Sequence, residues 1–180
     1  MPTDRPRRGL RDSYNRRVSQ RDLEIGADFL GEFLAKIEEC LALLSEEQVW
    51  WRANPATNSV GNLLLHLQGN LSQWVLASFG GVDYERHRSE EFTAARTANK
   101  AELIQGLRRV VEQCQAVIRG LAPEALARVR SIQGSDVDGA YVLWHVVEHM
   151  SYHTGQIVHI TKELRGPEAG IEFYPELRGQ

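Results

Sequence analysis

The sequence predicts an all-α protein built as a four-helix bundle. Four long segments place apolar residues at spacings of three, four and seven, which is the period of an α-helix. Strand signals are weak throughout the chain. Helices of about 20–25 residues with this spacing pack side by side around one core, and a chain of 180 residues is long enough for a single domain of this kind.

The first two helices of the bundle are expected in the N-terminal half of the chain. The first runs from about residue 21 to 44, with leucines recurring on one face. The second begins at Asn58 or Ser59, either of which can cap a helix, and continues to about residue 79. Gly80-Gly81 then ends it, because glycine readily adopts the conformation that closes a helix.

The other two helices follow a polar connection. Residues 82–99 are polar and have room for a short helix, and the third long helix is expected from about residue 100 to 119. Residues 128–138 are rich in polar residues and glycine and are expected to form a loop. The fourth helix is expected from about residue 138 to 164, ending before Gly166-Pro167.

Three parts of the chain differ in composition. Residues 1–19 form a basic arm, with six arginines against two aspartates, residues 20–165 hold the bundle domain, and residues 166–180 are expected to form an irregular tail. We expect the arm to be a solvated, poorly ordered segment. A contact with nucleic acid or an anionic surface, and a transit peptide, are the alternatives for an arginine-rich segment.

Charge and hydropathy argue against several classes of function. The net charge is −3 and the isoelectric point is near 6.1, so the chain as a whole has no electrostatic case for binding nucleic acid. No apolar run approaches the roughly 18–20 residues that span a bilayer, and no secretory signal is apparent. A cytoplasmic protein is therefore expected. Cys40 and Cys114 are then free thiols, although a disulfide between them stays open as an alternative.

A narrow polar stripe marks the second expected helix. At 100° per residue, the polar side chains that fall within about 40° of His66 belong to Ser59, Asn62, Asn70 and Gln73, and nearly everything else on this helix is apolar or small. One interpretation is a polar cleft wall in which His66 is a metal ligand. The other is a solvated face, or a core histidine hydrogen-bonded to Asn62 or Asn70.

Three histidines line one face of the fourth expected helix. His145, His149 and His153 step by four residues, about one helical turn. The outer two are about 12 Å apart along the axis, so one ion can use only an adjacent pair. We expect His149 and His153 to share an ion with His66 from the facing helix. Three imidazoles and an open position are typical of catalytic zinc.

Other side chains on these two faces are expected to orient the ligands or a substrate. They are Asn62, Asn70, His145, Glu148, Tyr152 and Gln156. A competing motif is present, because residues 145–149 (HVVEH) match the inverted zincin pattern, in which two histidines bind zinc and the glutamate acts as base. His87 and His159 lie away from both stripes and are expected to be incidental.

Residues 58–67 (NSVGNLLLHL) and 149–156 (HMSYHTGQ) resemble the DinB-like (YfiT-type) superfamily of metal-dependent proteins. The likeness extends from about residue 20 to about residue 164. Many members read His-Glu-x-x-His-Arg-Gly-Gln in the second segment, whereas this chain has Met150 for the glutamate and Thr154 for the arginine. The spacing of the histidines is unaffected by these departures.

This resemblance implies a bundle of up-down-down-up topology, often dimeric, with one metal ligand from the second helix and two from the fourth. Those ligands correspond to His66, His149 and His153. Characterised relatives include enzymes that use low-molecular-weight thiols. The lead hypothesis is therefore a metal-dependent enzyme in which zinc or nickel activates water or such a thiol. The rival is a non-catalytic, metal-binding helical dimer that acts as an interaction or stress-response module.

Overall fold

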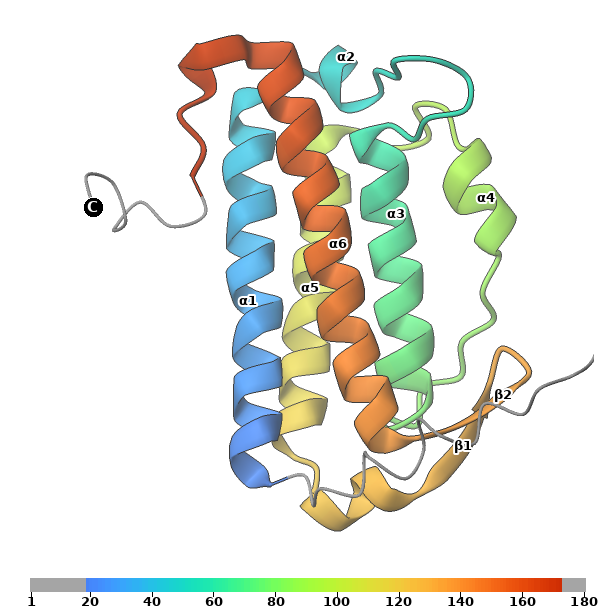
Figure 1. Cartoon of the computed structure of the whole chain (residues 1–180). Coiled ribbons are helices and arrows are strands. Elements are labelled where there is room, and N and C mark those ends of the chain that lie inside the picture. Colours follow the sequence, from blue (N-terminus) through green and yellow to red (C-terminus); the bar gives the residue numbers. More distant parts are fainter. Residues whose placement is uncertain (1–18, 173–180) are drawn as a thin grey trace, which may run out of the picture.

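The computed structural model describes residues 19–172, so the basic arm expected at residues 1–19, except for Ser19, and residues 173–180 lie outside the described residues. Four long helices form the bundle: α1 (Gln20–Leu43), α3 (Val60–Leu71), α5 (Lys100–Arg119) and α6 (Gly139–Arg165). Figure 1 shows them packed side by side. The predicted all-α bundle is thus confirmed, with helix boundaries within a few residues of those expected for α1, α5 and α6.

Contacts at the two ends of α5 show how it runs relative to α1. Arg119, the last residue of α5, pairs with Asp28 near the start of α1 at 2.7 Å. Lys100, the first residue of α5, donates to the carbonyl oxygen of Leu44 just after α1 ends, at 2.8 Å. The two helices are therefore antiparallel.

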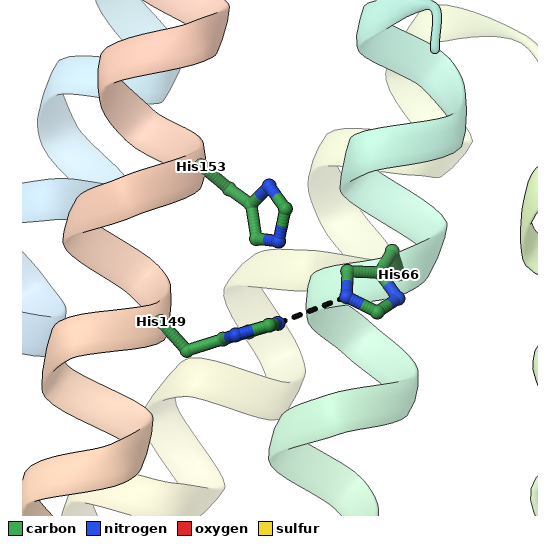
Figure 2. Close-up of side chains that lie close together, drawn as sticks. All are labelled: His66, His149 and His153. Atoms are coloured by element: carbon green, nitrogen blue, oxygen red, sulfur yellow. Dashed lines mark hydrogen bonds between the residues drawn. The ribbon is translucent and has the colours of Figure 1, made fainter. Parts of the chain in front are cut away.

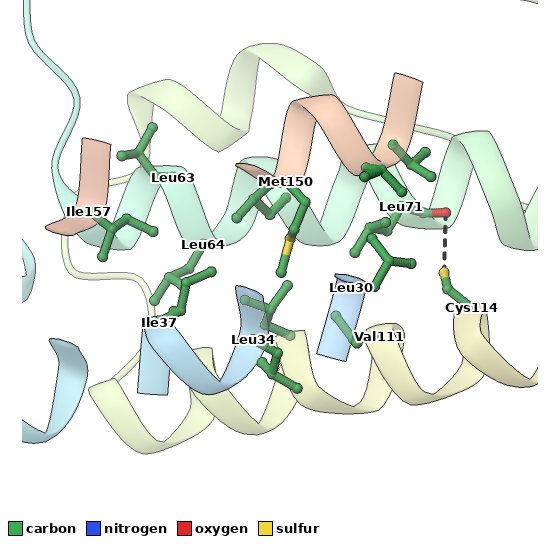
Figure 3. Close-up of a cluster of buried hydrophobic side chains, with 14 of the residues drawn as sticks. Leu30, Leu34, Ile37, Leu63, Leu64, Leu71, Val111, Cys114, Met150 and Ile157 are labelled. Atoms are coloured by element: carbon green, nitrogen blue, oxygen red, sulfur yellow. Dashed lines mark hydrogen bonds between the residues drawn. The ribbon is translucent and has the colours of Figure 1, made fainter. Parts of the chain in front are cut away.

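The contacts between α3 and α5 show the opposite relation. Gln68 of α3 donates to the Leu103 carbonyl oxygen, and Cys114 lies 3.7 Å from the Leu71 carbonyl oxygen (Figure 3). The residue numbers of the contacting pairs rise together along both helices, so α3 and α5 are parallel. The chain between them must return along the bundle, which explains the length of the connection. That connection includes α4 (Arg88–Thr93), which packs beside α3 (Figure 1).

The core is formed by one apolar stripe from each long helix. Ile37 of α1, Leu64 of α3, Val111 of α5 and Met150 of α6 are all buried in one cluster (Figure 3). Met150, which replaces the glutamate of the family pattern, is thus a core residue. Thr154, which replaces the arginine, is also buried and donates to the Met150 carbonyl oxygen at 2.7 Å. Both departures serve packing.

The cysteines are buried and free. Burial raises the pKa of the Cys114 thiol to about 12 and also raises the pKa of Cys40. Both are therefore protonated, inert core residues near neutral pH. No disulfide joins them, which sets that alternative aside.

The prediction of a loop at residues 128–138 is wrong. The chain there forms a hairpin of β1 (Val129–Ile132) and β2 (Ser135–Asp138), paired antiparallel. Gln133 and Gly134, the two residues of the turn, both have positive φ (52° and 76°), as tight hairpin turns require. The two strands are short and mostly exposed, so they lack the alternation of apolar and polar residues that would reveal them.

The second expected helix changes pitch before it ends. After Leu71 the chain forms a π-helical turn, η2 (Ser72–Ala77), in place of the expected regular helix to residue 79. A π-turn holds more residues than an α-turn and so rotates the later side chains relative to the preceding face. Gln73 and Trp74 therefore do not follow the 100° projection that places His66 and Asn70.

Short helical segments join the longer elements. α2 (Glu46–Val49) follows α1, and 3-10 turns occur at η3 (Pro123–Ala127) and η4 (Gly166–Ala169). Beyond α6, Ala169 and Ile171 are buried in the core. Packing of the described chain therefore continues past the bundle into the segment expected to be irregular. Among the described residues, no helix has the length and apolar character needed to cross a membrane.

Each long helix begins at a side-chain cap, which gives a test of local stability. Asn99 caps α5 by accepting from the Glu102 backbone N–H at 2.8 Å, and Glu102 accepts in return from the Asn99 N–H. Asn99→Ala should lower the free energy of unfolding by about 0.5–2 kcal/mol, whereas Asn99→Ser should lower it less. Urea denaturation measures both. Equal losses would show that the cap contributes nothing.

Candidate metal centre

Three histidines from α3 and α6 meet between these two helices. His66 projects from α3, and His149 and His153 project from adjacent turns of α6 (Figure 2). One ring nitrogen from each lies within 4.8 Å of the other two. His66 Nε2 and His149 Nε2 are 2.9 Å apart. The structure thus brings together the three residues that the sequence pattern selects.

The orientation of His66 is fixed by a buried carboxylate. Its Nδ1 lies 2.7 Å from Glu91 Oε2, and both side chains are buried. A carboxylate can only accept, so Nδ1 carries the proton and Nε2 is left with a lone pair facing the other histidines. A carboxylate behind a histidine ligand is a common arrangement in metal sites.

Glu91 is held in turn by Arg86. The Arg86 Nε and Nη2 atoms donate to the two Glu91 carboxylate oxygens at 2.6 and 2.8 Å. The pair packs against Gly69 of α3, where a Cβ atom would overlap with the carboxylate. Burial by itself raises the pKa of Glu91, but hydrogen bonds from His66 and Arg86 outweigh it and leave that pKa below its ordinary value. Glu91 is therefore ionised.

The second histidine of α6 has its own positioning partner. His153 Nδ1 lies 2.7 Å from Gln156 Oε1, which accepts from it. His153 is therefore protonated at Nδ1 and presents Nε2, the atom that faces the cluster. The ring of Tyr152, which is itself exposed, stands edge-on to His153 with centroids 5.1 Å apart.

Burial and neighbouring histidines favour the neutral forms of His149 and His153. Burial, and then the proximity of His153, His66 and His145, lower the pKa of His149 to about 3. Burial and the proximity of His66 also lower the pKa of His153, against the effect of its hydrogen bond to Gln156. Neutral imidazole is the form that binds metal, so these residues are ready as ligands at neutral pH. The residues present therefore fit a divalent ion.

His145 lies one turn outside this group. Its ring packs 4.1 Å from that of Trp74 and 5.3 Å from that of His149, measured between centroids. Asn70 Nδ2 approaches His145 Nε2 at 3.4 Å. Asn70 Oδ1 and Trp74 Nε1 are buried without a hydrogen-bond partner among the described residues. One unpaired acceptor and one unpaired donor beside His145 suit a water molecule or the polar end of a small ligand.

The remaining candidates lie in different surroundings. Asn62 is buried and donates to the carbonyl oxygens of Glu91 and Ala94, so it fastens the α4 segment onto α3. Glu148 is exposed. In the inverted zincin alternative, His145 and His149 would be the ligands, but the metal-compatible group among the described residues joins His149 to His66 and His153.

Sequence reasoning did not find Glu91 or Arg86. Both lie in the connection between α3 and α5, which has no helical periodicity and reads as a charged surface segment. The available signal was Gly69, a glycine inside α3 on the side where these two residues pack. A small residue inside a helix indicates close approach by another segment, but it does not say which one.

This combination of fold and site defines a class of protein: a helical bundle whose facing helices hold a three-histidine group suited to a metal ion. The chain belongs to the family described as "Protein of unknown function (DUF1572)", whose model matches residues 18–171. None of the curated proteins matches the sequence.

Two solved structures share the fold. The crystal structure of a conserved protein from Enterococcus faecalis has a TM-score of 0.66 at 20% identity, covering 79% of this chain and 96% of the other. The crystal structure of a DinB-like protein from Bacillus cereus has a TM-score of 0.60 at 15% identity, covering 74% of this chain and 87% of the other. The chain thus shares its fold with a DinB-like protein, as the resemblance implies.

The depressed pKa of His149 predicts loss of stability in acid. In the unfolded chain the imidazole takes up a proton below about pH 6.5, whereas in the folded protein it resists until about pH 3. The stability gained from neutral His149 is complete above pH 6.5 and declines as the pH falls from there. Melting temperatures measured in chelator should fall over this range, and less steeply in His149→Gln. Parallel curves would contradict this assignment.

Proposed function

We propose that the protein is a metal-dependent enzyme in which His66, His149 and His153 hold a divalent ion and a small thiol or water reacts beside it. The observation that supports this best is the convergence of three imidazole nitrogens within 4.8 Å, two of them oriented from behind by Glu91 and Gln156. Three imidazoles leave a coordination position open. Zinc and nickel both suit imidazole ligands.

The bound ion would supply Lewis acidity, which lowers the pKa of a thiol or water and makes it nucleophilic near neutral pH. The chain supplies orientation and shelter. Glu91 and Gln156 hold the Nδ1 protons of His66 and His153, so neither ring can turn. Asn70 Oδ1 and Trp74 Nε1, which have no hydrogen-bond partner among the described residues, would receive polar groups of the substrate.

The reaction proposed is transfer of a thiol to an electrophile. The thiol sulfur forms a bond to an electrophilic carbon of the acceptor, while the bond from that carbon to its leaving group breaks and the leaving group keeps the electron pair. The thiol proton passes to solvent. Candidate thiols are glutathione, bacillithiol and mycothiol, and hydrolysis is the parallel reaction when water is the nucleophile.

The experiment is a screen of metal-loaded protein with these thiols and a set of electrophiles. His153→Ala should abolish both metal retention and transfer, because it removes a ligand. Asn70→Ala should lower the rate of transfer about tenfold and keep the metal, since it removes only a hydrogen-bonding group. If metal-loaded protein neither binds nor transfers any thiol and hydrolyses nothing, the enzyme proposal fails.

A non-catalytic dimer is the rival proposal. Large apolar side chains stay exposed on two long helices, Ile25 and Phe29 on α1 and Tyr141 and Trp144 on α6. Exposed apolar residues of this size favour burial against a partner. In that case the metal would stabilise the fold, and metal removal would lower the melting temperature without any associated activity. Sedimentation of the full chain with Trp144→Glu tests the dimer separately.

A further inference from the structure

A second feature of α6 has no role in holding the histidines. A cavity of about 680 Å³ lies between the loop that follows α2 and the last turns of α6. We call it the Gly155 groove, lined by Trp51, Ala56, Leu63, Gly155, Gln156 and Ile160 among others. Its volume is in the range of small-molecule sites, about 300–1,000 Å³.

Nothing in the described part of the chain requires glycine at position 155. It lies in the interior of α6, it is absent from the glycines with positive φ, and a Cβ added there would meet nothing within 4 Å. Glycine inside a helix costs roughly 0.5–1 kcal/mol relative to alanine. Neither the backbone nor the packing of the described chain requires it. Because Gly155 lines the groove, a side chain at this position would take up part of its volume.

The groove borders the histidine cluster through Gln156. Its Oε1 accepts from His153, so its amide nitrogen remains as a donor, and that nitrogen has no hydrogen-bond partner between residues 19 and 172. Tyr152 also lines the groove and packs edge-on to His153. A molecule in the groove would thus contact two side chains that touch a proposed metal ligand.

The charge of the lining selects the ligand. Among the described residues that line it, the formally charged one is Glu163, 3.7 Å from His159, and none is a lysine or an arginine. Arg52, which follows Trp51 in the chain, donates instead to Asn62 Oδ1 and the Phe92 carbonyl oxygen. An anionic ligand would therefore find no lysine or arginine among these lining residues, whereas their aromatic and aliphatic walls favour an apolar body.

We infer that the Gly155 groove binds an uncharged or cationic molecule with an apolar, ring-sized body and a hydrogen-bond acceptor for the Gln156 amide. The further assignment of this molecule as the electrophilic acceptor of the thiol rests on the function proposed above. The carboxylates of glutathione do not suit this lining, so the thiol approaches from the side of Asn70 and Trp74. The two substrates then lie on opposite sides of the histidine cluster.

Binding of three naphthalene probes to the full chain tests the lining. Naphthamide is neutral, naphthylmethylamine is cationic and naphthoate is anionic, with the same ring in each. Titration calorimetry should show that the amide and the amine bind at least about tenfold tighter than naphthoate, a difference of about 1.4 kcal/mol. Glu163→Gln should weaken the binding of naphthylmethylamine and leave the affinity for naphthamide unchanged. Equal affinity for all three, or no binding of any, overturns the proposal.

Gly155→Leu tests the position of the site. Leucine favours helix, so this variant should fold at least as stably as the parent while its side chain fills the groove, weakening naphthamide at least about tenfold. Ser151→Leu is the matched control, because it adds the same side chain one turn earlier at an exposed position that does not line the groove. Unchanged naphthamide binding in folded Gly155→Leu would place the site elsewhere.

Running each titration with metal and with chelator separates the two proposals. If the protein retains no metal but naphthamide binds and Gly155→Leu abolishes binding, the enzyme proposal fails and the groove stands. If metal is retained and no probe binds, the groove assignment fails alone. If Gly155→Leu instead converts a dimer to a monomer, the groove is occupied by a second copy of the chain. That result would also overturn the proposal of a small-molecule site.

Discussion

His149→Ala is expected to abolish metal retention and, with it, the rise in melting temperature that zinc or nickel produces. The three imidazole nitrogens lie within 4.8 Å of one another, and removing one leaves two ligands for an ion that needs at least three from the protein. Metal bound only to the folded state stabilises it by about 2.7 kcal/mol at a concentration one hundred times the dissociation constant. The variant should lose this whole increment.

The same variant should fold normally in chelator. His149 is half-buried, and its burial and the proximity of His153, His66 and His145 lower its pKa to about 3, so near neutral pH its truncation removes no charge and leaves no charged partner behind. His159→Ala is the matched control, since His159 is an exposed histidine on the same helix whose partner is Glu163. It should retain metal, as should His145→Ala. Elemental analysis and thermal scans with metal and chelator measure both effects, and one bound metal per chain in His149→Ala would contradict the assignment.

How much of this could be predicted from sequence depends on how local each signal is. The three histidines were accessible because spacing along a helix fixes which side chains share a face, as for His149 and His153. Ser59, one of the two cap candidates that the sequence offers for the second helix, is the N-cap of α3. The fold followed from four such periodic segments, because burying four apolar stripes together leaves few arrangements.

The features that could not be predicted from the sequence depend on contacts between segments far apart in the chain. The carboxylate behind His66 comes from Glu91, 25 residues later, on a short helix in a polar connection. No periodicity links the two positions. The π-turn after Leu71 is similarly hidden, since it changes the direction of Gln73 without altering the apolar pattern. The β1–β2 hairpin escaped because its strands are short and mostly solvent-exposed.

Glu91→Ala should be the most destabilising change at the metal centre, even though Glu91 is not itself an expected metal ligand. The Arg86 and Glu91 side chains are 4% and 9% exposed, and the substitution leaves the guanidinium of Arg86 buried without its carboxylate. Breaking a buried ion pair from one side typically costs about 3–5 kcal/mol. His66 also loses the acceptor that orients its ring, so metal affinity should fall by about 10–100-fold.

Urea denaturation in chelator isolates the stability effect, and competition with a chelating dye measures the affinity. Glu90→Ala is the matched control, because Glu90 is an exposed neighbour on the same short helix α4. The stability and metal affinity of Glu91→Gln should lie between those of Glu91→Ala and Glu90→Ala. The glutamine amide oxygen can still accept from His66, but it carries no charge to pair with Arg86. Removing both partners, as in Arg86→Met with Glu91→Met, should cost less than the two single changes added together, because no unpaired charge is left behind. If Glu91→Ala behaves like Glu90→Ala, the buried pair neither holds α4 to α3 nor orients His66, and the histidine cluster must be organised by α3 and α6 alone.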